Sequence, residues 1–209
     1  MATVPSPRPD LLEAAAAYVR QVQAALQGLP LGPVAILLDH LIAARQAGRT
    51  VFIFGNGGSS STASHMAGDL GKGTIVAGHP RVRALSLTDN VPAFSAWAND
   101  TEYARVFAEQ LQALARPGDI AIAISASGNS PNVIQGIEAA RSLGLFTAAF
   151  LGFGGGKAER LVDLAIVVPS GEYGPVEDVH LILNHLVTTV LRDVARSGPP
   201  DGTAAGQPE

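Results

Sequence analysis

The chain has 209 residues, of which 47% are hydrophobic and 15% are charged, and its formal net charge is −4. These values fit one α/β domain with a sizeable core and argue against nucleic-acid binding through a basic surface. The sequence contains no cysteine, which excludes disulfides and thiolate chemistry.

The pattern of apolar residues divides the chain into a flexible N-terminus over 1–9, a single domain over 10–196 and a disordered tail over 197–209. The domain begins with two helices, and short apolar strands then alternate with helices. The expected helices are 10–28, 33–48, 60–71, 102–115, 131–143, 157–162 and 177–196, and the expected strands are 51–54, 82–87, 119–124, 146–151 and 164–168. This alternation predicts a three-layer α/β sandwich around a five-stranded parallel sheet.

The sequence also bears on location. No run approaches the roughly 20 continuous apolar residues that a membrane-spanning helix needs. Residues 1–10 are rich in proline and lack the apolar segment of a signal peptide. We therefore expect a cytoplasmic protein that has neither a membrane nor a nucleic acid as its partner.

Two short polar loops each follow an apolar strand and precede a helix. Residues 54–61 read FGNGGSSS, and residues 125–132 read SASGNSPN. Backbone N–H groups at a helix start, together with small hydroxyls, bind anions. Because ligands of parallel sheets bind beyond the carboxyl ends of the strands, the two loops predict a site for a sugar phosphate.

Two nucleotide-binding patterns are incomplete in this chain. In the first polar loop, Ser60 stands where the dinucleotide pattern has its third glycine. Residues 152–158 read GFGGGKA, with Leu151 in place of the first glycine of a nucleotide phosphate loop and Ala158 in place of its Ser or Thr. The spacing therefore argues against both nucleotide functions.

The two loops resemble the sugar isomerase (SIS) domain family and, within it, the phosphoheptose isomerases. The resemblance runs from about 11 to 194 and rests on the two loops together with His65, Asp69, residues 98–100 (AND), residues 177–180 (EDVH) and His185. It implies a flavodoxin-like SIS fold and a homotetramer with active sites at the subunit interfaces. It also implies an aldose–ketose isomerase that converts sedoheptulose 7-phosphate to a D-glycero-heptose 7-phosphate through an enediol or enediolate.

The resemblance assigns the polar loop residues to the substrate. The family's phosphate-binding serines match four positions, each of which could instead cap a helix: Ser59, Ser125, Ser127 and Ser130. The other substrate-binding candidates are Asn56, Gly57, Gly58, Asp89 and Asn90. Asp89 and Asn90 compete for one role, because the stretch up to Asp100 is one residue longer than is usual in the family.

Four residues match the family's metal site: His65, Asp69, Glu177 and His185. His65 and Asp69 are four residues apart, so on a helix they share one face, as a plain surface ion pair also would. Two carboxylates and two imidazoles suit Zn²⁺, and also manganese or iron. Asp69, Glu177 and His185 are the catalytic candidates, with one carboxylate as the base and His185 as the general acid.

This chain departs from the family pattern at three positions. Asp69 replaces a glutamate, Glu177 a glutamine and Gly174 a substrate-side aspartate, so either carboxylate could be the base. On one unbroken helix Glu177 and His185 would lie about 12 Å apart along the axis. Either the helix begins after Glu177, or different subunits contribute to each site.

The departures keep two alternative functions open. The first is an isomerase for a related sugar, such as an octose phosphate. The second is a non-catalytic SIS module that binds a sugar phosphate or a protein partner. Because all four metal-type side chains are present, the sequence favours an enzyme over a binding module.

Overall fold

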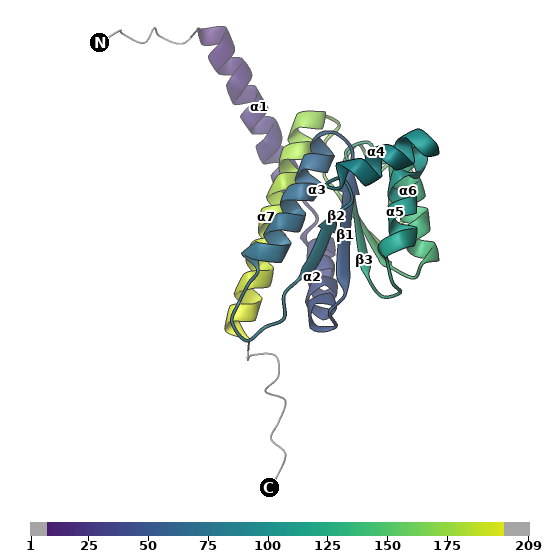
Figure 1. Cartoon of the computed structure of the whole chain (residues 1–209). Helices are drawn as coiled ribbons and strands as arrows, with labels where there is room; N and C mark the ends of the chain where they lie inside the picture. The colour runs from purple at the N-terminus through teal and green to yellow at the C-terminus, as the bar shows by residue number, and fades with distance from the viewer. Residues whose placement is uncertain (1–7, 199–209) are drawn as a thin grey trace, which may run out of the picture.

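The computed structural model describes residues 8–198, in which helices flank a single parallel sheet (Figure 1). The strands lie in the order β2-β1-β3-β4-β5, and every pairing is parallel. This confirms the predicted α/β fold, and the order is that of flavodoxin-like sheets. The strands are β1 (Thr50–Gly55), β2 (Arg83–Ser86), β3 (Ile120–Ser125), β4 (Phe146–Leu151) and β5 (Leu164–Val167).

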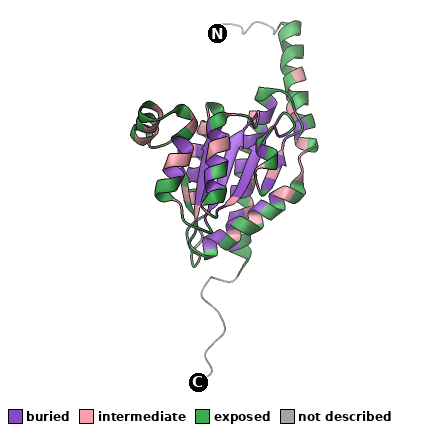
Figure 2. Ribbon diagram, turned by 90° about the vertical axis from the view of Figure 1, so that its right-hand side faces the viewer, coloured by how far each residue is buried: buried purple, intermediate pink, exposed green. Residues whose placement is uncertain are grey.

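Alternate residues of each strand point to opposite faces of the sheet and join different hydrophobic cores. Val51 and Ile53 pack with the first helical layer, whereas Phe52 and Phe54 pack with the second. Figure 2 shows the buried sheet enclosed by helices whose outer faces are exposed. The first layer holds α2 (Leu31–Gln46), α3 (Gly58–Gly68) and α7 (Tyr173–Ser197); the second holds α4 (Val91–Asp100), α5 (Val106–Leu114) and α6 (Pro131–Ser142).

The structure has one helix that the periodicity does not predict, α4. Its start carries ordinary helix signals, because Pro92 lies in the first turn and the side chain of Asn90 accepts a hydrogen bond from the N–H of Ala93 at 3.2 Å. A 3₁₀ turn, η2 (Tyr103–Arg105), separates α4 from α5. The sequence predicts a single helix over 102–115, where the structure has η2 followed by α5.

Two other predicted helices differ from the structure. The segment 157–162 holds only a 3₁₀ turn, η3 (Ala158–Arg160), because the chain must enter β5 a few residues later. α7 begins at Tyr173, four residues before the predicted start at 177. The predicted flexible N-terminus and disordered tail lie largely outside the described residues.

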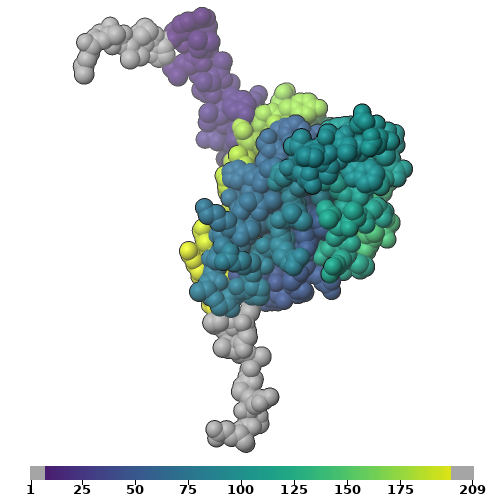
Figure 3. Space-filling view, viewed as in Figure 1, coloured from purple at the N-terminus to yellow at the C-terminus, as the bar shows by residue number. Residues whose placement is uncertain are grey.

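The N-terminal end of α1 (Pro9–Gln27) projects from the rest of the chain (Figures 1 and 3), whereas Tyr18 and Ala25 contact the start of α7. Ala25, near its C-terminal end, is its only buried residue, and the large apolar side chains of Leu11, Leu12 and Val19 are exposed. Within residues 8–198, no single helix is long and apolar enough to span a membrane; α1 and α2 meet that test only as a pair bent by 67°.

The order of the strands places the two polar loops side by side. β1 pairs with β3, so the loops that leave their carboxyl ends lie next to each other. The helices that follow these strands, α3 and α6, lie on opposite faces of the sheet. The chain therefore diverges at this edge, and such a switch point is where open α/β sheets bind ligands.

His180 fastens α7 to the carboxyl end of the sheet. Its ring is fully buried, and Nε2 lies 3.2 Å from the backbone carbonyl oxygen of Leu151, the last residue of β4. The other ring nitrogen, Nδ1, is buried without a hydrogen-bond partner among the described residues. Burial lowers the pKa of His180 to about 4, although the hydrogen bond to Leu151 favours the protonated ring. The ring is therefore neutral near pH 7 and holds α7 through Nε2.

We expect His180 to make the folded chain sensitive to acid. Its pKa is about 4 in the folded chain against 6.5 for an ordinary histidine, so the unfolded chain takes up the proton first as the pH falls. This contribution to stability is full above pH 6.5 and falls by about 3 kcal/mol as the pH drops toward 4. Equilibrium urea unfolding at a series of pH values measures the loss.

The matched variant is His180→Gln. Glutamine keeps an N–H donor for the carbonyl of Leu151 and cannot be protonated in this range. The difference between wild type and variant isolates His180 from the carboxylates that titrate at lower pH. Equal slopes of unfolding free energy against pH for the two proteins would contradict the assignment.

Candidate active site

The first polar loop turns sharply from β1 into α3, and two glycines make the turn possible. A Cβ on Gly55 would lie 2.5 Å from the carbonyl oxygen of Ile124 and 2.8 Å from the Cβ of Ser59, so no side chain fits there. Gly57 has φ 54° and ψ −123°, a conformation that other residues rarely adopt. α3 then begins at Gly58. The loop thus brings the N-terminal N–H groups of α3 and the hydroxyl of Ser59 to the edge of the sheet.

The second polar loop joins β3 to α6 and carries the other three candidate serines. The Oγ atom of Ser125 accepts a hydrogen bond from the N–H of Gly128 at 3.2 Å, and that of Ser127 accepts one from the N–H of Asn129 at 3.3 Å. Ser130 is the N-cap residue of α6, but its hydroxyl makes no capping hydrogen bond. Each of the three hydroxyls therefore still has a proton to donate to an anion.

A pair of asparagines ties the two loops together. Asn56 and Asn132 exchange side-chain hydrogen bonds, each amide N–H donating to the other's oxygen at 2.8 Å. The hydroxyl of Tyr103 donates to Asn56 at 3.0 Å, and the N–H of Val133 donates to Asn132 at 3.0 Å. No pattern in the sequence predicts this role for Asn132, because its burial (1% exposed) becomes visible only in the fold.

The glycine-rich segment 152–157 supports the second loop from behind. The N–H of Ala158 donates to the carbonyl of Gly128 at 3.0 Å, and the N–H of Lys157 donates to the side chain of Asn129 at 3.1 Å. Any Cβ on Gly156 would collide with the carbonyl of Ser127. This segment, which fails the nucleotide pattern, therefore braces the loop of serines.

The two loops enclose a cavity of about 150 Å³, which we call the serine cavity. None of the described residues that line it is Lys, Arg or His. An anion there would bind hydroxyls and the N-terminal ends of α3 and α6, both of which carry partial positive charge. The lining residues are Asn56, Ser59, Ile124, Ser125, Ala126, Ser127, Ser130, Tyr173 and Glu177.

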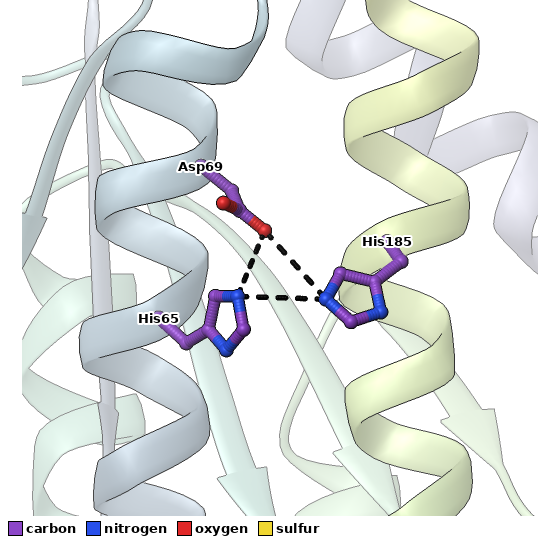
Figure 4. A group of neighbouring side chains, drawn as sticks. All are labelled: His65, Asp69 and His185. Carbon is purple, nitrogen blue, oxygen red and sulfur yellow. Dashed lines mark hydrogen bonds and ion pairs between the residues drawn. The ribbon is translucent and has the colours of Figure 1, made fainter.

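A second group of polar side chains lies farther along α3 and α7 (Figure 4). The Nε2 atom of His65 is 3.2 Å from Oδ2 of Asp69, and Nε2 of His185 is 3.9 Å from the same oxygen. The two Nε2 atoms are 3.4 Å apart. We call these three residues the metal group; all three side chains are partly open to solvent.

The local structure aims Asp69 at the two histidines. α3 passes into a π-helical turn, η1 (Asp69–Gly73), whose first residue is Asp69, and such turns occur often at functional sites. The side-chain N–H of Asn184 donates to Oδ2 of Asp69 at 3.0 Å. Asn184 is fully buried on α7, and the sequence predictions do not include it. The signal that could have identified it is its position among the apolar residues that form the buried face of α7.

The metal group fits a zinc ion by geometry and by chemistry. A point equally distant from its three ligand atoms lies about 2 Å from each, which is the usual length of a Zn–N or Zn–O bond. Two neutral imidazoles and one carboxylate are also a common donor set for zinc sites that keep an open position. The residues therefore fit the cofactor that the sequence predicts.

Glu177 lies apart from the metal group. A Cβ on Gly58 would come within 2.5 Å of Oε2 of Glu177, which places this carboxylate at the opposite end of α3 from Asp69. α7 is unbroken from Tyr173, so the alternative in which the helix begins after Glu177 is wrong. The structure thus brings together three of the four predicted ligands and puts Glu177 in the serine cavity.

The remaining candidates, Asp89 and Asn90, lie beyond the end of β2. Asp89 accepts a hydrogen bond from the hydroxyl of Ser64 on α3, whereas the side chain of Asn90 caps α4. The neighbouring Thr88 lines a second cavity of about 270 Å³ together with Gly57. Both candidate side chains are thus engaged in hydrogen bonds within the chain, and neither lines the serine cavity.

Comparison with known proteins decides the family. A model of the SIS domain matches residues 13–152. A phosphoheptose isomerase of Paramagnetospirillum magneticum is 37% identical over 165 residues, which make up 78% of this chain and 84% of that protein. The chain belongs to the phosphoheptose isomerase family of SIS domain proteins. A family member from Mycobacterium tuberculosis is 40% identical over 150 residues, 72% of this chain and 76% of that protein.

Solved structures of the family agree with the fold. The phosphoheptose isomerase GmhA from Neisseria gonorrhoeae matches with a TM-score of 0.80 and 28% identity, over 88% of this chain and 99% of that one. A phosphoheptose isomerase from Francisella tularensis has a TM-score of 0.81 at 24% identity. The predicted family and the predicted SIS fold are therefore both confirmed.

Gly174, where the family pattern has an aspartate, lies against the side chain of Tyr18. A Cβ on Gly174 would lie 2.8 Å from the hydroxyl oxygen of Tyr18, so Tyr18 fills the space that a side chain there would need. The hydroxyl of Tyr18 donates to the carboxylate of Asp178, which raises the pKa of Tyr18. α1 thus closes over the start of α7 through Tyr18, next to the serine cavity.

We expect Asn132→Ala to loosen both polar loops, because it removes the buried side chain that exchanges two hydrogen bonds with Asn56. Unfolding free energy should fall by about 1–3 kcal/mol, the usual net contribution of two hydrogen bonds. Inorganic phosphate should also bind more weakly in calorimetric titration. Asn99→Ala, at an exposed asparagine whose side chain donates to its neighbour Asp100, is the control and should change neither value. Equal losses in both variants would contradict the role of the pair.

Proposed function

We propose that this chain interconverts sedoheptulose 7-phosphate and a D-glycero-heptose 7-phosphate. The observation that carries the proposal is that an anion cavity and a metal-type group lie at the two ends of the same helix, α3. Ser59 and His65 are separated by about 9 Å along α3, as estimated from the helical rise. That span is comparable to the distance between the phosphate and the carbonyl end of an extended seven-carbon sugar phosphate.

In this proposal the serine cavity holds the phosphate. Ser59, Ser125, Ser127 and Ser130 donate hydroxyl protons, and the helix starts at α3 and α6 add N–H groups. Asn56 and Asn132 keep these donors in place before the ligand arrives. Support comes from the geometry of the loops and from the relatives, which are named phosphoheptose isomerases.

The reacting end of the sugar then lies at the metal group. Asp69 removes a proton from C1 of the ketose, and His185 gives a proton to the C2 oxygen, which yields an enediol. Asp69 next returns its proton to C2 while His185 takes the proton from the C1 oxygen, which yields the aldose. Of the two carboxylates, Asp69 is the better base candidate because it lies 3.9 Å from His185.

Zinc is the metal that we propose for His65, Asp69 and His185. When bound, it would stabilise negative charge that develops on the substrate oxygens. With its Nε2 atom as a metal ligand, His185 would carry its proton on the other ring nitrogen, Nδ1. Asn184 would hold the Asp69 carboxylate in place, because it donates to Oδ2, the oxygen that lies nearest both histidines.

We also propose that the chain forms a homotetramer. The exposed apolar side chains along α1 support this assembly, because they would lose contact with water against a second copy. A partner subunit would then cover the open side of the metal group, where the histidines are exposed to solvent.

The test of isomerisation is NMR of the purified chain with sedoheptulose 7-phosphate and zinc in deuterated buffer. We expect a new aldose anomeric signal with deuterium at C2. Asp69→Asn and His185→Gln should each lower kcat by about 10²–10⁴, the range for loss of a general acid or base. Both variants should still bind inorganic phosphate. A wild-type chain that binds the sugar phosphate without converting it would overturn the reaction.

Zinc binding is tested separately by calorimetric titration of the metal-free protein. His65→Ala and His185→Ala should each weaken zinc binding by at least about 10-fold, because each removes one of three ligand atoms. His79→Ala removes a histidine outside the metal group and should leave the affinity unchanged. Equal zinc affinity in all three variants would exclude the group as the zinc site.

A further inference from the structure

The carboxylate of Glu177 lies where an anionic ligand is expected. A Cβ on Gly58, the first residue of α3, would be 2.5 Å from its Oε2 atom and 3.2 Å from its Oε1 atom. The same side chain lines the serine cavity with Ser59 and Ser127. Glu177 thus rests against the positive end of α3, a position that stabilises a negative charge.

A bound phosphate would meet this charge at close range. Among the described residues that line the serine cavity, Glu177 is the only carboxylate, and no Lys, Arg or His is there to balance it. The cavity measures about 150 Å³, so phosphate and carboxylate would share a small space with little water between them. Like charges in such surroundings repel each other. Glu177 therefore weakens the binding of any bare anion.

Sugar hydroxyls offset the repulsion. An ionised carboxylate only accepts hydrogen bonds, whereas each hydroxyl of a sugar has a proton to donate. A sugar phosphate carries such hydroxyls on the carbons next to its ester, but inorganic phosphate brings no carbon-bound hydroxyl beside the serines. Hydrogen bonds to a charged acceptor are stronger than those between neutral groups.

We propose that Glu177 makes the serine cavity select phosphate esters of polyhydroxylated sugars over inorganic phosphate. Glu177 is then a specificity residue at the phosphate end of the site. The inference rests on the proposed function only in taking the serine cavity as the phosphate site. It does not require that the chain isomerise its ligand.

The test compares two ligands that the chain cannot convert, inorganic phosphate and sorbitol 6-phosphate, which has no carbonyl group. Glu177→Gln keeps the shape of the side chain and removes its charge. We expect the variant to bind inorganic phosphate about 10-fold more tightly, equivalent to about 1.4 kcal/mol, with little change for sorbitol 6-phosphate. Calorimetric titration gives both dissociation constants, and their ratio measures the selectivity.

Glu172→Gln is the matched control. It makes the same charge change at an exposed residue beside the first turn of α7, outside the lining of the serine cavity. Solvent screens an exposed charge, so both affinities should stay close to those of the wild type. An equal gain in phosphate affinity in this control would overturn the inference, because net charge alone would then explain it.

Two further results would overturn the inference. One is an unchanged or weaker affinity of Glu177→Gln for inorganic phosphate. The other is an equal gain for both ligands, which would leave selectivity unchanged. Failure of the proposed function looks different: the wild type would retain its selectivity yet leave sedoheptulose 7-phosphate unconverted.

Discussion

The parallel packing of α3 against α7 is the constraint on which the site depends. Three contacts in matching order define it: Gly58 lies against Glu177, His65 faces His185, and farther along Gly73 meets Thr188. Both helices are fixed to the same face of the sheet by a continuous hydrophobic core. Because this packing sets the positions of Asp69 and both histidines, the metal group needs no loop to assemble it. Polar groups on rigid elements hold their geometry better than groups on loops.

The serine cavity is built on a different principle from the metal group. Its donors are small hydroxyls and helix-start N–H groups, which have little reach and must be placed accurately by the backbone. Accuracy comes from glycines that allow close approach, from the amide pair of Asn56 and Asn132, and from the brace at 152–157. Such prior ordering lowers the entropy lost when a ligand binds. Because no Lys, Arg or His is among the described residues that line the cavity, attraction of an anion depends on how these donors are directed.

The sequence was sufficient wherever short-range patterns decide the outcome. Apolar runs predict the five strands, of which β1, β3 and β4 are almost fully buried, and the spacing of His65 and Asp69 predicts one helical face. The serine loops were also readable, because strand, small residues and helix start follow one another directly in the chain. The resemblance to a known family supplied His185, which no local pattern connects to residues 120 positions earlier.

Long-range packing explains what the sequence could not supply. The place of Glu177 depends on the register between α3 and α7, which is set by buried side chains on both helices. Asn132 and Asn184 look like ordinary polar residues until the fold buries them against Asn56 and Asp69. The sequence excludes a nucleotide-binding loop at the glycines 154–156. Their contacts with the second polar loop become visible only in the fold, where β3 and β4 pair side by side.

If the serine cavity holds the phosphate, the length of α3 fixes the distance between the phosphate and the metal group, and with it the length of sugar that can reach both. A sugar phosphate with fewer carbons would place its phosphate on the serines and stop short of Asp69, while a longer one would have to fold or overshoot. Discrimination by chain length would then need no steric gate, since the rise of the helix sets the distance. In that case, adding or removing one helical turn between the two ends would be the direct route by which such a scaffold changes the length of sugar it accepts.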